Sequence, residues 1–114
     1  LAAYGPRGKQ VHDRLAKRLG HSPSSLVLFA YEGMALTLDA IRTANETPGF
    51  VDMPIDRERD LVRDAALATD TRDSVIGTYS IDIFGDTTTT LFGGYRVEDG
   101  KLVRGRSFAT GSVS

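Results

Sequence analysis

An acidic turn holds the first residues whose type and spacing could do chemistry: Asp82 and Asp86, with Gly85 between them. Two carboxylates could bind calcium, but a calcium loop needs more oxygen donors and a distal Glu, which this segment lacks. A catalytic carboxylate pair would need burial or a shaped cleft, and this turn is expected to be exposed. We therefore expect both side chains to cap backbone amides within the turn.

The other candidate motifs are incomplete. Gly5–Lys9 resembles a phosphate loop but lacks the four-residue spacer between glycines and the Ser/Thr after Lys, so it is read as a helix entry. His12 and His21 have no Asp, Glu or Cys nearby at metal-ligand spacing. Ser107 sits in a predicted strand, and its surroundings depart from the nucleophile elbow. We expect no catalytic residue, metal ligand or cofactor, and no enzymatic activity.

Composition narrows the class of protein further. The chain has 114 residues, 40% of them hydrophobic, which suits one domain. A net charge of −1 gives no sign of the excess positive charge that binding to nucleic acid or to an anionic membrane would need. The absence of cysteine excludes disulfides, and no apolar run reaches the length of a membrane span. A local cluster of basic residues is expected to form the solvent-exposed face of a helix: Arg7, Lys9, Arg14, Lys17 and Arg18.

Three helices are predicted. Residues 7–19 carry an apolar stripe at every fourth position, with Pro6 at the start and Gly20 as the stop. A second helix is expected from a Ser22 cap to Ala44; because it is apolar over most of its circumference, it should be buried between layers. A third is expected over residues 57–68, with Asp56 as its cap.

Strands follow the helices. Residues 75–82 alternate with period two, 83–86 form a turn, and 88–98 are long and β-prone. Asp99-Gly100 predicts a type I′ hairpin that places Glu98 opposite Lys101 and Val97 opposite Leu102, with the last strand ending near Phe108. The fold class is therefore α/β, or α+β for the chain alone. We expect residues 1–108 to form one unit and residues 109–114 a flexible tail.

Three segments in order resemble one family. Gly77 to Asp86, followed by Tyr95-Arg-Val-Glu-Asp-Gly-Lys101, resembles the "G-x-x-x-F-D-x-x-G-D" turn and "Y-x-V-x-D-G-K" hairpin of the branched-chain amino-acid receptors, the type I periplasmic substrate-binding proteins. Tyr31 to Ile41 resembles their "Y-D-A-x-x-x-L-x-x-A-I" helix, and Arg63 to Thr69 their "R-D-A-L-x-A-T" helix. Glu32 in place of Asp and Ile81 in place of an aromatic are departures expected to affect the fold little and to leave the ligand open.

The resemblance implies a two-lobed fold of which this chain is the C-terminal portion. It implies that Leu26, Phe29 and Tyr31 lie near the ligand cleft, although all three could equally be core residues. It also implies a hinge in the last passage between lobes, at Thr88, Thr89, Thr90, Gly93 and Gly94.

The function implied is capture of an amino acid or similar small polar solute for an ABC importer, outside the cytoplasm in the periplasm or at the cell surface. The partners implied are that ligand and an ABC permease. The alternative is a stand-alone ligand-sensing or interaction domain derived from the same fold. Because its central helix needs cover on two sides, we also expect the chain to form a homo-oligomer, with Met34, Leu38 or the last hairpin at the contact.

Overall fold

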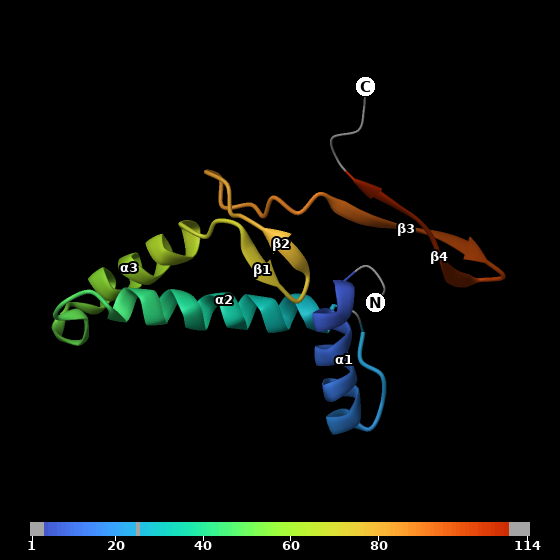
Figure 1. Ribbon diagram of the computed structural model, residues 1–114, viewed down its shortest axis with the longest axis horizontal. Helices are drawn as coiled ribbons and strands as arrows, with labels where there is room; N and C mark the ends of the chain where they lie inside the picture. Colours follow the sequence, from blue (N-terminus) through green and yellow to red (C-terminus); the bar gives the residue numbers. More distant parts are fainter. Residues whose placement is uncertain (1–3, 25, 110–114) are drawn as a thin grey trace.

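The structure, a computed structural model, describes residues 4–24 and 26–109. In this part of the chain, three helices precede two antiparallel hairpins (Figure 1). This confirms the expected order of helices followed by hairpin strands. The elements are α1 (Gly5–Leu19), α2 (Val27–Asn45), the 3-10 turn η2 (Phe50–Asp52), α3 (Ile55–Leu67), β1 (Arg72–Ser74), β2 (Gly77–Tyr79), β3 (Leu91–Glu98) and β4 (Lys101–Ala109).

The first helix ends as the sequence predicts. Gly20 adopts the left-handed conformation with φ of 75°, and its N–H donates to the Ala16 carbonyl. A glycine tolerates this φ without strain, so it stops the helix cleanly. Pro6 lies at the start, and α1 begins at Gly5, two residues before the predicted boundary. The helix stands across the N-terminal end of α2 (Figure 1).

The predicted start of α2 is wrong. The helix begins at Val27, not after a Ser22 cap. The backbone around Pro23 instead runs against α1, where the buried His12 donates from Nε2 to the Pro23 carbonyl at 2.9 Å. Because the Pro23 carbonyl accepts this bond from α1, the backbone at Pro23 stays outside α2. The C-terminal end, at Asn45, lies one residue beyond the prediction.

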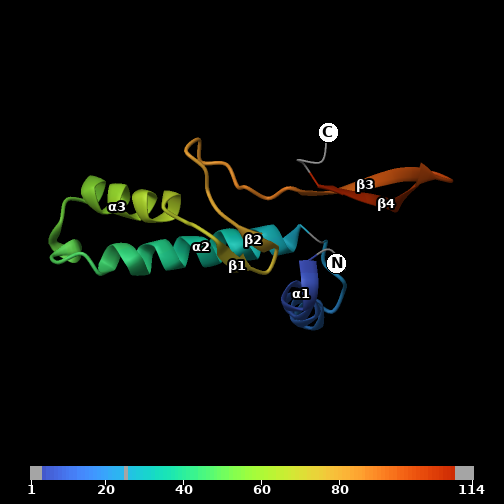
Figure 2. The ribbon, with the colours of Figure 1, turned by 45° about the horizontal axis from the view of Figure 1, so that its top comes forward.

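The third helix starts two residues earlier than predicted and ends one residue earlier, covering Ile55–Leu67. Asp56 is not the cap; it lies in the first turn with Glu58, and Pro54 precedes the helix. Acidic groups in a first turn favour the positive end of the helix dipole. Both ribbon views show α3 running back along α2 (Figures 1 and 2).

The predicted strand 75–82 is wrong at its start: Val75 and Ile76 form a turn, the range holds only the short strand β2, and its partner β1 lies before it at Arg72–Ser74. β1 pairs with β2 so that Ser74 faces Gly77 across Val75 and Ile76. The Ser74 hydroxyl makes the turn, because it donates to the Gly77 carbonyl and accepts from the Ile76 N–H. Val75 at the turn is 4% exposed, since it is part of the core.

The terminal hairpin confirms the predicted register. Asp99 and Gly100 have φ of 48° and 74°, Glu98 faces Lys101, and Val97 faces Leu102. The preceding strand is shorter than predicted, because β3 begins only at Leu91. β4 runs one residue past the prediction, to Ala109, and the rest of the expected tail, residues 110–114, lies outside the described residues.

The core is small and one-sided. Val11, Leu28 and Val75 form its centre, with exposures of 5%, 0% and 4%. The radius of gyration is 17.7 Å, whereas a compact domain of this length has about 13 Å. The prediction that α2 is buried between two layers is wrong for this chain. One face is covered, while the opposite face leaves Met34 61% and Leu38 53% exposed.

Gly8 allows α1 to approach the β1–β2 turn closely, and this gives a prediction. A Cβ at Gly8 would lie 2.5 Å from the Val75 carbonyl oxygen. We expect Gly8→Ala to destabilise the chain by about 1–3 kcal/mol, because backbone must shift to relieve the clash. Gly33→Ala is the matched control: nothing lies within 4 Å of its Cβ, and it should stabilise by about 1 kcal/mol. Thermal melts followed by circular dichroism measure whether each substitution raises or lowers the melting temperature. A Gly8→Ala variant with a raised melting temperature would contradict this close packing.

Candidate functional site

The three residues predicted to contact a ligand do not share one face of α2. Leu26 immediately precedes the helix and is 69% exposed. Phe29 packs edge-on against Tyr4, with ring centroids 5.9 Å apart. Tyr31, two residues on, projects about 160° away around the helix axis, because each helical residue turns by about 100°. The structure therefore does not bring Phe29 and Tyr31 together, and their role in ligand binding stays a prediction.

Tyr31 lines a concave pocket where α1 meets α2. The pocket holds about 230 Å³, and α1 contributes its other walls: Val11, Arg14, Leu15 and Arg18. An aromatic ring, two aliphatic side chains and two cations on one concavity suit a small solute that has both an apolar part and an anionic part. Of the three predicted residues, Tyr31 lines this cavity.

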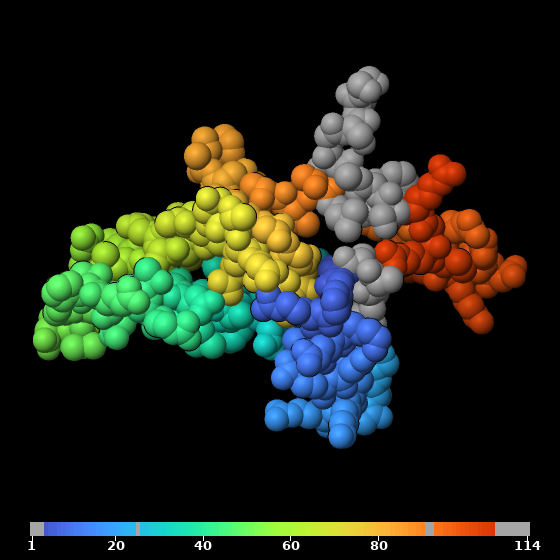
Figure 3. Space-filling view, in the orientation of Figure 1, coloured from blue at the N-terminus to red at the C-terminus, as the bar shows by residue number. Residues whose placement is uncertain are grey.

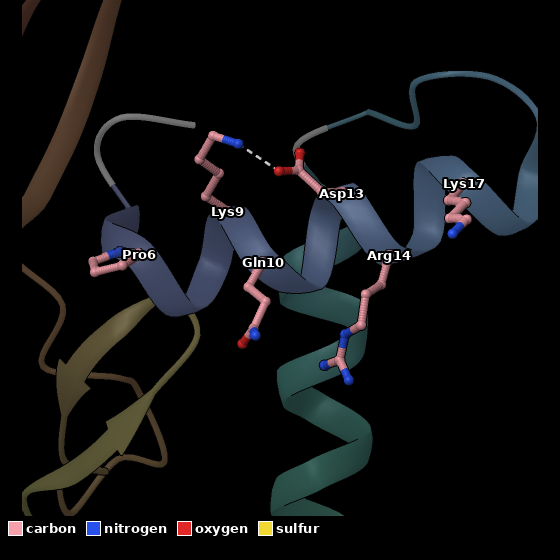
Figure 4. A pocket seen from close by; sticks show the side chains of 6 residues that line it. All are labelled: Pro6, Lys9, Gln10, Asp13, Arg14 and Lys17. Carbon is pink, nitrogen blue, oxygen red and sulfur yellow. Dashed lines mark hydrogen bonds and ion pairs between the residues drawn. The ribbon is translucent and has the colours of Figure 1, made fainter.

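A second hollow lies on the outer side of α1. It holds about 430 Å³ and is lined by Pro6, Lys9, Gln10, Asp13, Arg14 and Lys17 (Figure 4). Lys9 bonds Asp13 one turn along, which neutralises part of the positive charge. The pairing lowers the pKa of Asp13. This surface agrees with the predicted wet helix face and shows no arrangement for chemistry.

A network of polar side chains joins α2 to the first hairpin. Glu32 is 4% exposed and accepts two hydrogen bonds on Oε1, one from Arg72 Nε at 2.5 Å and one from the Tyr79 hydroxyl at 3.0 Å. Arg72 also reaches Asp39 at 2.8 Å. A buried carboxylate is tolerated only when it is paired and hydrogen-bonded, and this one is. We call Glu32, Asp39, Arg72 and Tyr79 the anchor network.

The anchor network shifts the pKa values of its members. Hydrogen bonds from Arg72, and then from Arg42, lower the pKa of Asp39. The carboxylates raise the pKa of Arg72, chiefly through the bond to Glu32. Burial, followed by the bond to Glu32, raises the pKa of Tyr79 to about 12. These shifts favour the charged forms of Asp39 and Arg72 and the neutral phenol of Tyr79, which is an arrangement for holding structure rather than for moving protons.

The raised pKa of Tyr79 predicts a loss of stability in alkali. The folded-state pKa is about 12 against an ordinary 10.0, so the unfolded chain loses the proton first. The contribution is therefore complete below pH 10 and is lost as the pH rises towards 12. We expect a tyrosinate absorbance phase near pH 12 and a fall of the unfolding midpoint in the same alkaline range. The Tyr79→Phe substitution should remove both. A Tyr79→Phe variant with the same alkaline profile would contradict this.

Sequence reasoning missed the anchor network. Glu32 was considered only as a replacement for Asp, and the structure shows it buried beneath the hairpin. The signal available was its position one turn after Leu28, on the face that becomes the core. Its two hydrogen-bond partners lie 40 and 47 residues away in the sequence. No local spacing rule reports a pairing over that distance.

In the acidic turn the predicted capping is confirmed for Asp82, whereas Asp86 takes part through its backbone N–H and carbonyl. Asp82 Oδ1 accepts from the N–H groups of Phe84 and Asp86, both at 2.9 Å, so it caps the turn. Within residues 4–24 and 26–109, no cluster of three or more metal-ligating side chains occurs. No described helix is long and apolar enough to cross a membrane.

The predicted hinge residues fall into two groups. Thr88 is held to Ser80 by two bonds, one from its N–H to the Ser80 carbonyl and one from the Ser80 N–H to its hydroxyl, both at 2.9 Å. Thr89 and Thr90 connect this point to β3. Gly93 and Gly94 lie inside β3, where the pairing register shifts. Movement at these positions stays a prediction.

Comparison with known proteins identifies the fold. No protein-family model and no curated protein matches the sequence. Among solved structures, the chain resembles the leucine-binding protein LivK from Thermotoga maritima MSB8, with a TM-score of 0.68 and 22% sequence identity. The match covers 96% of this chain and 28% of that protein. The three helices and two antiparallel hairpins therefore form an α+β segment with a periplasmic-binding-protein-like fold.

Proposed function

We propose that this chain is the C-terminal segment of a solute-binding protein that captures an amino acid or a similar small polar solute for an ABC importer. One observation supports the proposal most: almost the whole chain superposes on a leucine-binding protein. The order of the Tyr31, Arg63, Gly77 and Tyr95 motifs supports it independently. The neighbour is a binding protein and not an enzyme, which agrees with the absence of a nucleophile–base pair in the sequence.

In this proposal the protein works outside the cytoplasm, in the periplasm or at the cell surface, and delivers its ligand to a membrane permease. The chain spans 28% of the neighbour's length, so most of a two-lobed cleft would lie in sequence outside this segment. Tyr31 is the best-placed candidate for ligand contact, because it lines the pocket between α1 and α2. Leu26 and Phe29 remain predicted contributors from the start of the same helix.

A stand-alone sensing or interaction domain is the second reading. The open face of α2, which leaves Met34 and Leu38 exposed, favours it, because such a face would serve an interaction partner. The two proposals differ in whether the chain forms part of a ligand cleft. A transport segment completes a ligand cleft, whereas an interaction domain needs no cleft.

A chimera tests the proposed function. The segment of LivK that superposes on this chain would be replaced by this chain, and leucine binding would be measured by calorimetry. We expect the folded chimera to bind with micromolar affinity, about −8 kcal/mol, since both walls of a cleft are then present. The isolated chain should bind more weakly than this, because it supplies only part of the cleft.

The chimera carrying Asn in place of Tyr31 tests the site within the same experiment. If Tyr31 packs on the ligand, the exchange lowers affinity while circular dichroism remains unchanged. A well-folded chimera that binds none of the common amino acids would contradict the proposed function. An isolated chain that binds leucine with micromolar affinity would contradict the incomplete cleft.

A further inference from the structure

A strained residue lies where three segments of the chain meet. The end of α3, the first hairpin and the passage from β2 to β3 come together at one junction (Figures 1 and 3). Within the residues that the structure describes, Thr71 and Asp99 are the non-glycine residues with positive φ. Asp99 belongs to a hairpin turn that requires this conformation, whereas Thr71, with φ of 45°, is a β-branched residue that disfavours it. Such strain persists only where neighbouring contacts impose it.

The strain at Thr71 comes from one extra residue in the strand pairing. Arg72 and Tyr79 form the last pair of β1 and β2. Beyond this pair, the Ile81 N–H donates to the Thr69 carbonyl at 3.0 Å. Tyr79 and Ile81 are two positions apart in the sequence, whereas Thr69 and Arg72 are three positions apart, so the first side holds one residue more. An extra residue of this kind is a β-bulge, and its left-handed position is usually taken by glycine.

The Ser80 hydroxyl holds the strained residue in place. It accepts from the Thr71 N–H at 2.8 Å and donates to the Asp70 carboxylate at 2.7 Å. The Thr71 hydroxyl also donates to Asp70, at 3.0 Å. The bond from Ser80, and then the bond from Thr71, lower the pKa of Asp70, so the acceptor is charged at neutral pH. Hydrogen bonds to a charged group are stronger than neutral ones, so these contacts can offset the strain. We call Asp70, Thr71 and Ser80 the clamp.

We propose that this junction is a two-position switch, in which the chain pairs either in the observed bulged register or in a regular register. In the regular register, the Ile81 N–H would bond the Asp70 carbonyl in place of the Thr69 carbonyl. Thr71 would then take the extended backbone that a β-branched residue prefers. The strain at Thr71 favours the regular register, and the clamp favours the observed one. The Ser80 hydroxyl is therefore the group that selects between them.

The two registers would place the end of α3 differently. Thr69 is tied to the last turn of α3, because its N–H and its hydroxyl both donate to the Ala66 carbonyl, at 3.2 and 2.7 Å. A change of register by one residue moves this point along β2 by about 3.3 Å. Ser80 is bonded in turn to Thr88, in the passage to β3. The switch would thus couple the position of α3 to the path on which the chain leaves β2.

Relaxation-dispersion NMR tests the switch with two substitutions. Ser80→Ala removes the hydroxyl of the clamp, and we expect millisecond exchange at residues 69–71 and 80–81, several-fold above that of the unchanged chain. The minor-state chemical shifts of Thr71 should be those of extended backbone. Thr71→Gly removes the strain and should abolish the exchange, because glycine accepts the observed φ. The double variant should keep the observed register for the same reason.

Thr90→Gly is the matched control for melting temperature. It makes the same exchange in the passage to β3, at a residue whose φ is not positive. Thr71→Gly should melt several degrees above Thr90→Gly, and equal melting temperatures would overturn the proposal because Thr71 would then carry no strain. A Ser80→Ala variant in which Thr71 keeps its left-handed shifts without exchange would also overturn it.

The double variant decides the case in which Ser80→Ala alone fails to fold. A folded double variant would support the switch, because relief of the strain restores the chain, and an unfolded one would overturn it. No ligand is present in these measurements. The outcome therefore stands apart from that of the chimera and from the proposed function.

Discussion

Arg72→Ala is expected to destabilise the chain more than any exposed change. It leaves Glu32 buried at 4% exposure, with the Tyr79 hydroxyl as its remaining hydrogen-bond donor in the anchor network. Removing one member of a buried pair costs about 3 kcal/mol or more, because the remaining charge is uncompensated. This is a large fraction of the stability of a small domain. Urea unfolding followed by circular dichroism should show the midpoint fall sharply, or helix lost in water.

Two companion variants separate charge burial from general damage. Arg42→Ala removes an exposed partner of the same Asp39, with 73% of its side chain exposed, and should change stability by less than about 1 kcal/mol. Replacing Glu32 and Arg72 together with Met, and Tyr79 with Phe, should recover most of the loss, because no buried polar group is then left alone. If Arg72→Ala and Arg42→Ala behaved alike, the anchor network would contribute no more than a surface pair.

Leu28→Ala is expected to have a similar effect by a different cause. Leu28 is fully buried and joins α1, α2 and the first hairpin through Val11 and Val75. Truncation removes apolar contacts and leaves a cavity, at a cost of about 2–5 kcal/mol for a buried leucine. Because the cluster is small, few neighbours can relax into the space. The unfolding midpoint in urea measures this directly.

Leu19→Ala is the control for that change, since it makes the same truncation on α1 where the side chain is 52% exposed. It should shift stability by about 0.5 kcal/mol or less. Equal losses for the two leucines would mean that the cluster at Val11, Leu28 and Val75 is not the centre of the fold.

Local signals in the sequence predicted the local features well. Asp99-Gly100 fixed the register of the terminal hairpin, because both residues accept a positive φ. Gly20 ended α1 for the same reason. The capping role of Asp82 followed from its position two residues before the amide of Phe84. Each of these depends on residues fewer than five apart.

Features set by distant contacts were missed. The turn at Val75 was missed because Val75 and Ile76 are β-prone residues, although Ser74 and Gly77 flank them. Val75 is buried there with Leu28 and Val11. The start of α2 was misplaced because His12 holds Pro23. For the site, Tyr31 lines a cavity in the structure, and its predicted place at a ligand cleft stays a prediction; that cavity depends on α1, whose crossing with α2 no periodicity reports.

The long sequence separations inside the anchor network also bear on the order in which the chain folds. α2 and α3 are joined by a short connector, so they can pair within microseconds, as local helical contacts do. Glu32 must wait for Arg72 and Tyr79, which lie 40 and 47 residues on. Closing loops of that length comes late, because the entropy of closure precedes any gain from contact. The anchor network would therefore form after the pair of helices. It would slow unfolding more than it speeds folding.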